Sequence, residues 1–249
     1  RRACATIAGR SRCSVGSPAP VIERLHDVGC LVFADVASVR NAEKALAAGA
    51  DGLVLLSAGA GGHTGWANGM AFARTVRAMY DGPLVLAGGI SDGAALWATR
   101  VLGCDLGMAG TPFIATAESM AVDPYKQMLL DCRLDDVMLT QAFTGLDTNT
   151  LRPSIVAAGL DPDSLGGPVT PERAREMFSE YSKEARGPKR WIDIWAAGHT
   201  VSGVDAVRPV AALVAKLEAE YAAAQRATTK LLRDATARRE AGERVLGGV

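Results

Sequence analysis

The sequence lacks an excess of charge of either sign. Lysine plus arginine and aspartate plus glutamate both number 27, so the formal net charge is zero. Binding to nucleic acid or to an acidic membrane surface exploits a basic excess. The composition therefore argues against nucleic acid and membranes as partners, and we expect a small-molecule substrate instead.

Paired cysteines and long apolar runs are also missing. The five cysteines are odd in number and widely spaced, without a CxxC pair that would indicate zinc binding or redox exchange. We expect reduced, mostly buried thiols and no bound metal. No apolar run approaches the roughly 18 residues of a membrane span, and the first residues lack the apolar core of a secretory signal. These absences predict a cytoplasmic chain.

Aromatic residues are few. They make up 5% of the chain, whereas hydrophobic residues make up 49%. The core must therefore consist mainly of Ala, Val, Leu and Ile, which is typical of helices packed on parallel strands. A chain of 249 residues is long enough for one α/β barrel and buries a large core without disulfides.

From about residue 14 to 117, short apolar runs alternate with helical stretches, which indicates βα units around a parallel sheet. Ser38 and Asp92 stand where helix N-caps are expected, and Gly29 and Gly49 where helices end. Five strands are predicted, at residues 13–16, 30–36, 50–57, 83–88 and 104–110. A closed (β/α)₈ barrel needs eight, so we predict an α/β fold of TIM-barrel type that is N-terminally incomplete.

The sequence predicts three parts. Residues 1–132 hold the barrel strands, although the opening segment is basic and shows no clear periodicity. Residues 133–190 break the rhythm with turn signals and short helical pieces rather than strands, which indicates a small, mostly helical inserted cap. Residues 191–249 return to the barrel and continue into a long Ala-rich helix with a charged, solvated end.

Two glycine-bearing strand ends form the densest signal, LAGGI at 86–90 and MAGTPF at 108–113. Backbone N–H groups in such loops at the carboxyl ends of strands bind phosphate in many (β/α)₈ barrels. Gly88 and Gly89 would supply N–H donors, and Gly110 and Thr111 an N–H and a hydroxyl. One Gly-Gly pair alone is as easily a tight turn, but two in adjacent units favour a phosphate site.

A histidine follows two glycines at the end of an apolar strand, in AGAGGHTG at 58–65. We expect His63 to face the mouth of the barrel, where a near-neutral imidazole can remove a proton from carbon or hydrogen-bond a cofactor or substrate. The alternative is a loop histidine with a structural hydrogen bond. His26 is expected on a helix surface, and His199, in a Gly-rich turn, is a second candidate.

Four segments in this order, AGAGGHTG, VLAGGISDG, GMAGTPFIATAES and WAAGHTVSGV, resemble the nitronate monooxygenase or 2-nitropropane dioxygenase-like family of FMN-dependent barrels. The resemblance covers about residues 14–225. It implies that FMN is the cofactor and that His63 is the catalytic base or lies over the flavin. It also implies a set of FMN-binding residues: Gly61, Gly62, Ala87, Gly88, Gly89, Gly110, Thr111 and Gly198.

Counting back from the phosphate site makes 104–110 the family's eighth strand and 13–16 its fourth. The first three strands, with their Pro-Met-Gly-like segment beside the flavin ring, have no counterpart before residue 14. Three functions stay open: oxidation of alkyl nitronates by O₂, NAD(P)H-dependent flavin reduction of the enoyl-ACP or quinone reductase kind, and an inactive truncated paralogue. The natural substrate and the oligomeric state are not predicted.

Four further residues have structural explanations. Trp66 could help to shape a substrate pocket, but an exposed loop tryptophan that packs on its neighbour is an equally good explanation. Trp191 and Trp195 are expected to be core anchors. Glu118, which resembles a family glutamate, is expected to cap the next helix.

Overall fold

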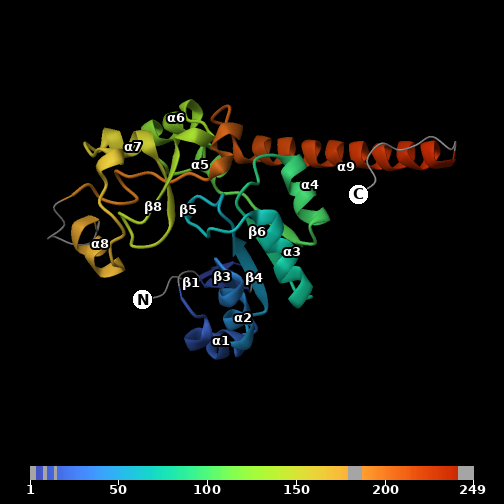
Figure 1. The fold of residues 1–249 in the computed structure, drawn as a ribbon, viewed down its shortest axis with the longest axis horizontal. Helices are drawn as coiled ribbons and strands as arrows, with labels where there is room; N and C mark the ends of the chain where they lie inside the picture. Colours follow the sequence, from blue (N-terminus) through green and yellow to red (C-terminus); the bar gives the residue numbers. More distant parts are fainter. Residues whose placement is uncertain (1–3, 8–9, 14–15, 179–186, 241–249) are drawn as a thin grey trace.

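The computed structural model describes residues 4–7, 10–13, 16–178 and 187–240. Their main element is a six-stranded sheet in the order β1-β2-β3-β4-β6-β7 (Figure 1). All neighbouring strands are parallel except β1, which runs antiparallel to β2. The strands are β1 (Cys4–Ile7), β2 (Arg10–Cys13), β3 (Leu31–Val36), β4 (Gly52–Leu56), β6 (Leu84–Ala87) and β7 (Leu106–Met108).

The predicted βα rhythm is confirmed, with a helix after each of β2, β3 and β6 and after the loop that follows β4. Ser38 Oγ accepts a hydrogen bond from Asn41 N at 3.1 Å, and Asp92 Oδ1 accepts one from Ala95 N at 2.8 Å, so both predicted N-caps are present. The helices are α1 (Ala19–His26), α2 (Val39–Ala47), α3 (Gly69–Met79) and α4 (Gly93–Val101).

Aliphatic side chains fill both faces of the sheet. The helix-facing side packs Val32, Val36, Leu53, Leu55 and Leu84 against the helices, and all five are fully or almost fully buried. The opposite face carries a smaller cluster around Val54, Leu56, Val85 and Ala87. Cys104 and Cys132 are buried free thiols, as expected, and Cys30 is a half-buried one; Cys13 is also buried.

The start of the chain differs from the prediction. The first parallel strand is β2, Arg10–Cys13, rather than residues 13–16, of which 14 and 15 lie outside the described residues. β1 pairs along its outer edge, so residues 4–7 and 10–13 of the opening segment form strands. The other four predicted parallel strands are present, and the six-stranded sheet of the described residues ends at β1 and β7.

The prediction that residues 133–190 hold no strands is wrong. β8 (Val137–Thr140) and β9 (Thr148–Leu151) pair antiparallel, and β5 (Gly62–His63) joins β9 to complete a three-stranded sheet. The strand β9 reads TNTL, and its threonines are buried through hydrogen bonds such as that between Thr144 Oγ1 and Thr148 Oγ1, at 2.8 Å. Without apolar alternation, the sequence carried no strand signal. The surrounding helices are α5 (Thr111–Ile114), α6 (Asp123–Asp131), α7 (Arg152–Ala157) and α8 (Pro171–Phe178).

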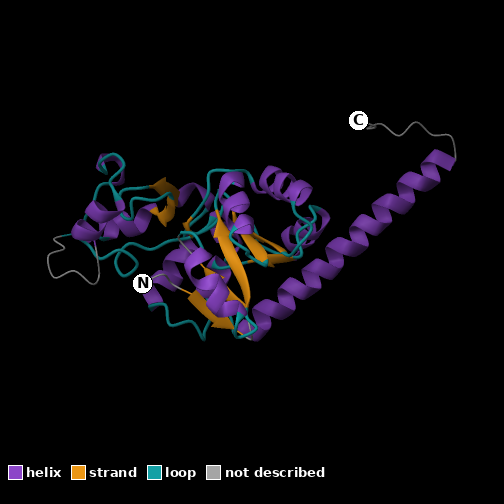
Figure 2. Cartoon of the chain, turned by 90° about the horizontal axis from the view of Figure 1, so that it is seen from below, coloured by secondary structure: helices purple, strands orange, loops and turns teal. Residues whose placement is uncertain are grey.

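The predicted long helix is α9 (Val210–Glu240), which packs its first half along α4 and then extends away from the body (Figures 1 and 2). Trp97 Nε1 donates to Thr228 Oγ1 at 3.0 Å, and its ring meets Tyr221 edge to face. Glu118 was expected to cap the helix that follows it, and this prediction is wrong. Its carboxylate instead accepts hydrogen bonds from Val210 N, at the start of α9, at 2.9 and 3.0 Å, because the chain returns beside Glu118 92 residues later. Within the described ranges, no helix has the length and apolar character needed to cross a membrane.

The contact between α4 and α9 depends on a close backbone approach at Gly93. A Cβ there would lie 2.1 Å from Tyr221 N and 2.3 Å from Leu217 O, and backbone atoms have little freedom to move aside. We therefore expect Gly93→Ala to lower the free energy of unfolding in urea by about 1–3 kcal/mol, as overpacking does. Gly166→Ala, whose Cβ would meet nothing within 4 Å, is the control. An unchanged midpoint for Gly93→Ala would contradict the close packing.

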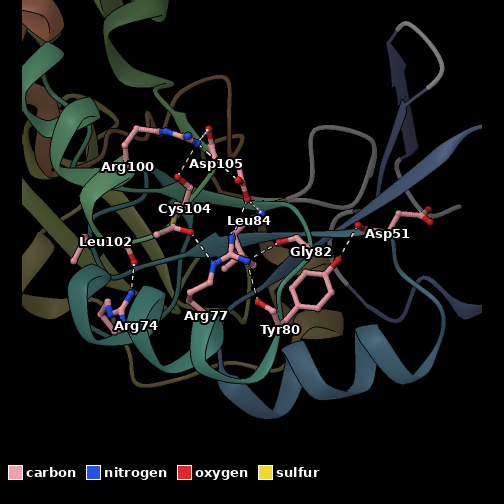
Figure 3. A network of polar contacts seen from close by, with 11 residues as sticks. Asp51, Arg74, Arg77, Tyr80, Gly82, Leu84, Arg100, Leu102, Cys104 and Asp105 are labelled. Atoms are coloured by element: carbon pink, nitrogen blue, oxygen red, sulfur yellow. Dashed lines mark hydrogen bonds and ion pairs between the residues drawn. The ribbon is translucent and has the colours of Figure 1, made fainter.

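A polar network fastens the amino ends of β4, β6 and β7 to α3 (Figure 3). Arg77 is its centre: Nε donates to Gly103 O at 2.7 Å, Nη1 to Tyr80 O and Gly82 O, and Nη2 to Asp105 at 2.8 Å. The Tyr80 hydroxyl donates to Asp51 O at 2.8 Å. This end of the sheet is therefore committed to structural hydrogen bonds, which leaves the carboxyl ends for function.

Candidate active site

A cavity of about 300 Å³ opens at the carboxyl ends of the parallel strands, where β4, β6 and β7 each run into a loop. Eight of the nine predicted site residues line it, and they come from four separate parts of the chain. They are Gly61, Gly62, His63, Ala87, Gly88, Gly110, Thr111 and Gly198. The ninth, Gly89, lines a neighbouring cavity instead. Sequence reasoning thus assembled a set of residues that the fold does bring together.

His63 lies on β5 rather than in a free loop, and its backbone pairs with Thr148. Its side chain is half-buried, and the ring makes no hydrogen bond. Nε2 is enclosed without a partner, the single such side-chain nitrogen or oxygen in the described part of the chain, whereas Nδ1 is not enclosed. The ring meets Trp191 edge to face, with centroids 5.5 Å apart and planes at 83°.

The surroundings of His63 favour its neutral form. Burial, and secondarily the positive charge of Arg190, lower the pKa of His63 below its usual 6.5. At neutral pH the imidazole is therefore uncharged and has a lone pair available to accept a proton. That state is the one a general base needs.

The predicted phosphate loops present backbone and hydroxyl groups to the cavity. Gly198 N donates to Thr111 Oγ1 at 2.9 Å, which fixes the hydroxyl of a residue that is only 4% exposed and leaves the hydroxyl hydrogen free to donate. A Cβ at Gly110 would meet no atom within 4 Å, so the backbone there borders open space. The loops of β6 and β7 can therefore surround an anion with neutral donors.

Arg12 and Asp35 are cavity residues that the sequence analysis missed. Arg12 Nε and Nη2 donate to the two carboxylate oxygens of Asp35 at 2.7 and 2.8 Å, and the Asp35 side chain is 2% exposed. This two-point pairing holds the guanidinium at the cavity wall. The signal was present: an aspartate inside the apolar strand LVFADV needs a partner when that strand is buried.

Tyr125 is another cavity residue that the sequence did not indicate. Its hydroxyl donates to Ala196 O, its ring stacks on Trp195 with planes 13° apart, and burial raises the pKa of Tyr125 to about 12. The hydroxyl therefore stays protonated throughout the physiological range.

Of the two tryptophans expected to be core anchors, Trp191 is not one, whereas Trp195 packs against the buried cluster around Leu129 and Leu151. Trp191 is 40% exposed, and Trp195 is half-buried against Tyr125. The anchor of this segment is Ile194, which is 1% exposed. Neither indole lines the cavity itself, but each contacts a residue that does: Trp191 meets His63, and Trp195 stacks on Tyr125.

Asn149, on β9, connects the cap to the loop before His63. Its Nδ2 donates to Ala58 O at 2.8 Å and to Ala60 O at 2.7 Å, and the residue is 1% exposed. One buried amide thus satisfies two loop carbonyls and holds the loop beside β9.

Replacing Asn149 tests this connection. We expect Asn149→Ala to lower the free energy of unfolding by about 2 kcal/mol, because two buried carbonyls lose their donor. The exposed Asn41, replaced by alanine, should change it by less than about 0.5 kcal/mol. Chemical denaturation measures both, and equal effects for the two variants would refute the assignment.

The remaining predicted residues lie outside this cavity. His199 and Trp66 border the neighbouring cavity together with Gly89; the His199 side chain is exposed, and Trp66 is 78% exposed, as expected of a loop tryptophan. His26 lies on the surface, where Nε2 is 2.8 Å from Asp51 Oδ2. Across the described ranges, no cluster of three or more His, Cys, Asp or Glu could hold a metal ion.

A neutral imidazole beside glycine-bearing loops, at the carboxyl ends of parallel strands, is typical of α/β proteins that bind a phosphate-bearing molecule in this place. Comparison with known families is consistent with this. Residues 7–220 match the family described as nitronate monooxygenase, and the chain belongs to that family. The resemblance inferred from four short motifs is therefore confirmed.

Individual relatives are more distant. A nitronate monooxygenase of Paraburkholderia phytofirmans is 28% identical over 214 residues, which cover 81% of this chain and 57% of the relative. A putative monooxygenase of Mycobacterium tuberculosis is 27% identical, with 84% and 58% covered. The chain thus spans less than two thirds of the length of either relative.

Solved structures show the same fold. FabK from Thermotoga maritima superposes with a TM-score of 0.70 at 26% identity, covering 90% of this chain and 70% of that one. A nitroalkane oxidase from Streptomyces ansochromogenes gives a TM-score of 0.67 at 28% identity, covering 86% and 64%. The family and these neighbours support an α/β oxidoreductase.

Proposed function

We propose that this chain forms the FMN-binding and base-bearing part of an oxidoreductase that oxidises alkyl nitronates with O₂. The observation that carries the proposal is the shared cavity: the ring of His63 and the loops of Gly88, Gly110 and Thr111 border one space. The family match and the likeness to a nitroalkane oxidase support the same reaction.

The residues present fit FMN. Its phosphate would lie among the N–H groups of Gly88 and Gly110 and the hydroxyl of Thr111, where no side chain blocks an anion. The backbone of Gly61, Gly62, Ala87 and Gly198 would line the remaining contact surface. Gly89 belongs to the same loop and would contribute through its backbone. When bound, FMN would supply the electron acceptor, since no protein side chain performs that chemistry.

Three side chains have distinct proposed roles. His63 would accept the carbon-bound proton of a nitroalkane or orient the nitronate, through Nδ1, its accessible nitrogen. Arg12, held by Asp35, would place a positive edge at the cavity wall, where a nitronate oxygen can be bound. Tyr125 would remain protonated and donate its hydrogen bond to the Ala196 carbonyl, which would fix the part of the cavity wall that these two residues form.

The test begins with binding. The purified chain is incubated with FMN, desalted and examined by absorbance between about 300 and 550 nm, and then assayed for nitronate turnover. Retained flavin bands and oxygen-dependent turnover are the expected result. Loss of the flavin on desalting would restrict the proposal to a longer protein that contains this chain, and retained flavin without turnover would refute the reaction.

A second candidate is the NAD(P)H-dependent flavin reductase that the sequence analysis left open. It is kept because FabK, like the nitroalkane oxidase, superposes on this chain, over 90% of its length. The two candidates differ in their electron donor. Rapid anaerobic bleaching of the flavin by NADPH or NADH would favour the reductase, whereas bleaching only by the nitronate would favour the monooxygenase.

A further inference from the structure

The imidazole of His63 lacks the hydrogen bond that usually orients a catalytic histidine. In most such sites one ring nitrogen donates to a carboxylate or carbonyl, which fixes both the tautomer and the ring orientation. Here neither nitrogen has a hydrogen-bond partner, and Nε2 is enclosed. An enclosed, unsatisfied N–H is costly, so another group must compensate for it.

Trp191 is the group in contact with that ring. The two rings meet edge to face, with centroids 5.5 Å apart and planes at 83°, which is the geometry in which an aromatic face can accept an N–H. His63 also borders a further cavity, which Lys44, Thr64 and Asp147 help to line, and Trp191 lines neither this cavity nor the shared one. Trp191 therefore contacts the imidazole without forming part of either cavity wall.

The backbone of Trp191 shows that its position is imposed by its neighbours. Its φ is +69°, the single positive value at a non-glycine residue of the described chain. Bulky residues rarely adopt this conformation, and it persists only where the surrounding contacts determine it. The turn around it is closed by three bonds: Trp191 N to Ile194 O at 3.2 Å, Asp193 N to Lys189 O at 2.8 Å, and Lys189 N to Asp193 Oδ2 at 2.7 Å.

We propose that Trp191 is a positioning residue: its indole receives the Nε2–H of His63, which fixes the neutral imidazole as the Nε2–H tautomer with the Nδ1 lone pair facing the cavity. The inference depends on the proposed function only for its catalytic meaning. The tautomer is a property of the chain alone, so it can be measured without cofactor or substrate.

The charges around the ring do not select a tautomer by hydrogen bonding. Arg190 comes from the segment that carries Trp191, Arg12 and Asp35 border the shared cavity, and Lys44 and Asp147 border the second cavity next to His63. None of them bonds to a ring nitrogen. The edge-to-face contact with Trp191 is therefore the interaction to which we assign the choice between the two nitrogens.

The experiment is ¹⁵N NMR of the chain labelled at its three histidines, with His26 and His199 as internal references. Above the pKa of His63, we expect a protonated-type shift for its Nε2 and an unprotonated-type shift for Nδ1. Trp191→Gly should fold, because glycine adopts a positive φ freely. We expect this variant to move both shifts toward a tautomer mixture, and Trp191→Phe, which keeps an aromatic face, to retain most of the wild-type pattern.

Trp66→Gly is the matched control, since it removes a second loop tryptophan that does not contact His63 and should leave both shifts unchanged. A protonated Nδ1 in the unmodified chain would overturn the proposal, and so would unchanged shifts in Trp191→Gly. If the chain retains flavin and turns over nitroalkane, Trp191→Gly should lower kcat about tenfold with little change in KM. Absence of turnover would count against the proposed function and leave the NMR test intact.

Discussion

Replacing His63 with asparagine should lower kcat/KM for a neutral nitroalkane by about 10²–10⁴-fold, the usual contribution of a general base. Asparagine fills a similar volume but cannot accept the proton. Its effect on a preformed nitronate should be much smaller, because that substrate has already lost its carbon-bound proton. Steady-state oxygen consumption with the two substrate forms measures this difference.

Flavin retention is the control for His63→Asn, since the phosphate loops are untouched. Equal losses for nitroalkane and nitronate would show that the imidazole orients the substrate, and unchanged turnover of both would exclude a role in the reaction. The pKa gives a further check. Because the pKa of His63 is lowered below 6.5, activity toward nitroalkanes should persist as the pH falls through 6.5 and decline only below it.

The same lowered pKa affects stability. Below pH 6.5 the unfolded chain takes up a proton at His63 before the folded chain does, so the free energy of unfolding should fall as the pH decreases through this value. His63→Asn should remove this contribution and flatten the dependence.

Gly88→Ala should abolish flavin retention, with FMN binding weakened at least about 100-fold, or about 2.7 kcal/mol. Gly88 has φ of +102°, and a Cβ there would lie 2.5 Å from both Ala60 N and Ser57 Oγ. Neither atom can yield easily, because Ala60 belongs to the backbone of the His63 loop and Ser57 Oγ donates to Ala87 O at 2.9 Å. The loop of β6 must therefore shift away from the phosphate site.

Gly49→Ala is the control that separates the strain of a positive φ from the displacement of the β6 loop. Strain alone should not weaken FMN binding. Gly49 has φ of +93° but lies after α2, where its Cβ would approach Ile22 no closer than 3.6 Å. Both variants should lose about 1–3 kcal/mol of stability from the unfavourable φ. Fluorescence titration with FMN should show weakened binding only for Gly88→Ala, and equal affinities in the two variants would refute the phosphate site.

The sequence predicted most of the sheet and most of the loops that border the cavity, for a common reason. A parallel strand that is buried on both faces is an apolar run in the sequence, and the loop at its end contains glycines, so LVLAGG indicated both β6 and the loop that lines the cavity. The helix caps at Ser38 and Asp92 were equally local signals. Features that depend on a few consecutive residues were therefore predictable.

What the sequence did not predict depends on contacts between distant segments. Asn149 is one polar residue among several in TNTL, and nothing local distinguishes it. Only the folded structure places its side-chain amide next to the carbonyls of Ala58 and Ala60, to which it donates. Glu118 was expected to cap the helix that follows it, because nothing local indicates that Val210 returns beside it. The exposure of Trp191 likewise follows from the turn between Lys189 and Ile194 rather than from the hydrophobicity of the side chain.

The pairing of β5 with β9 has a consequence for the evolution of this fold. His63 and the loops of Gly88 and Gly110 all belong to the first 132 residues, but the backbone of His63 pairs with Thr148 of β9. The position of the imidazole therefore also depends on the segment that follows residue 132. Exchanging that segment for the corresponding segment of a relative would preserve this position only if the new segment offered a strand edge that pairs with β5.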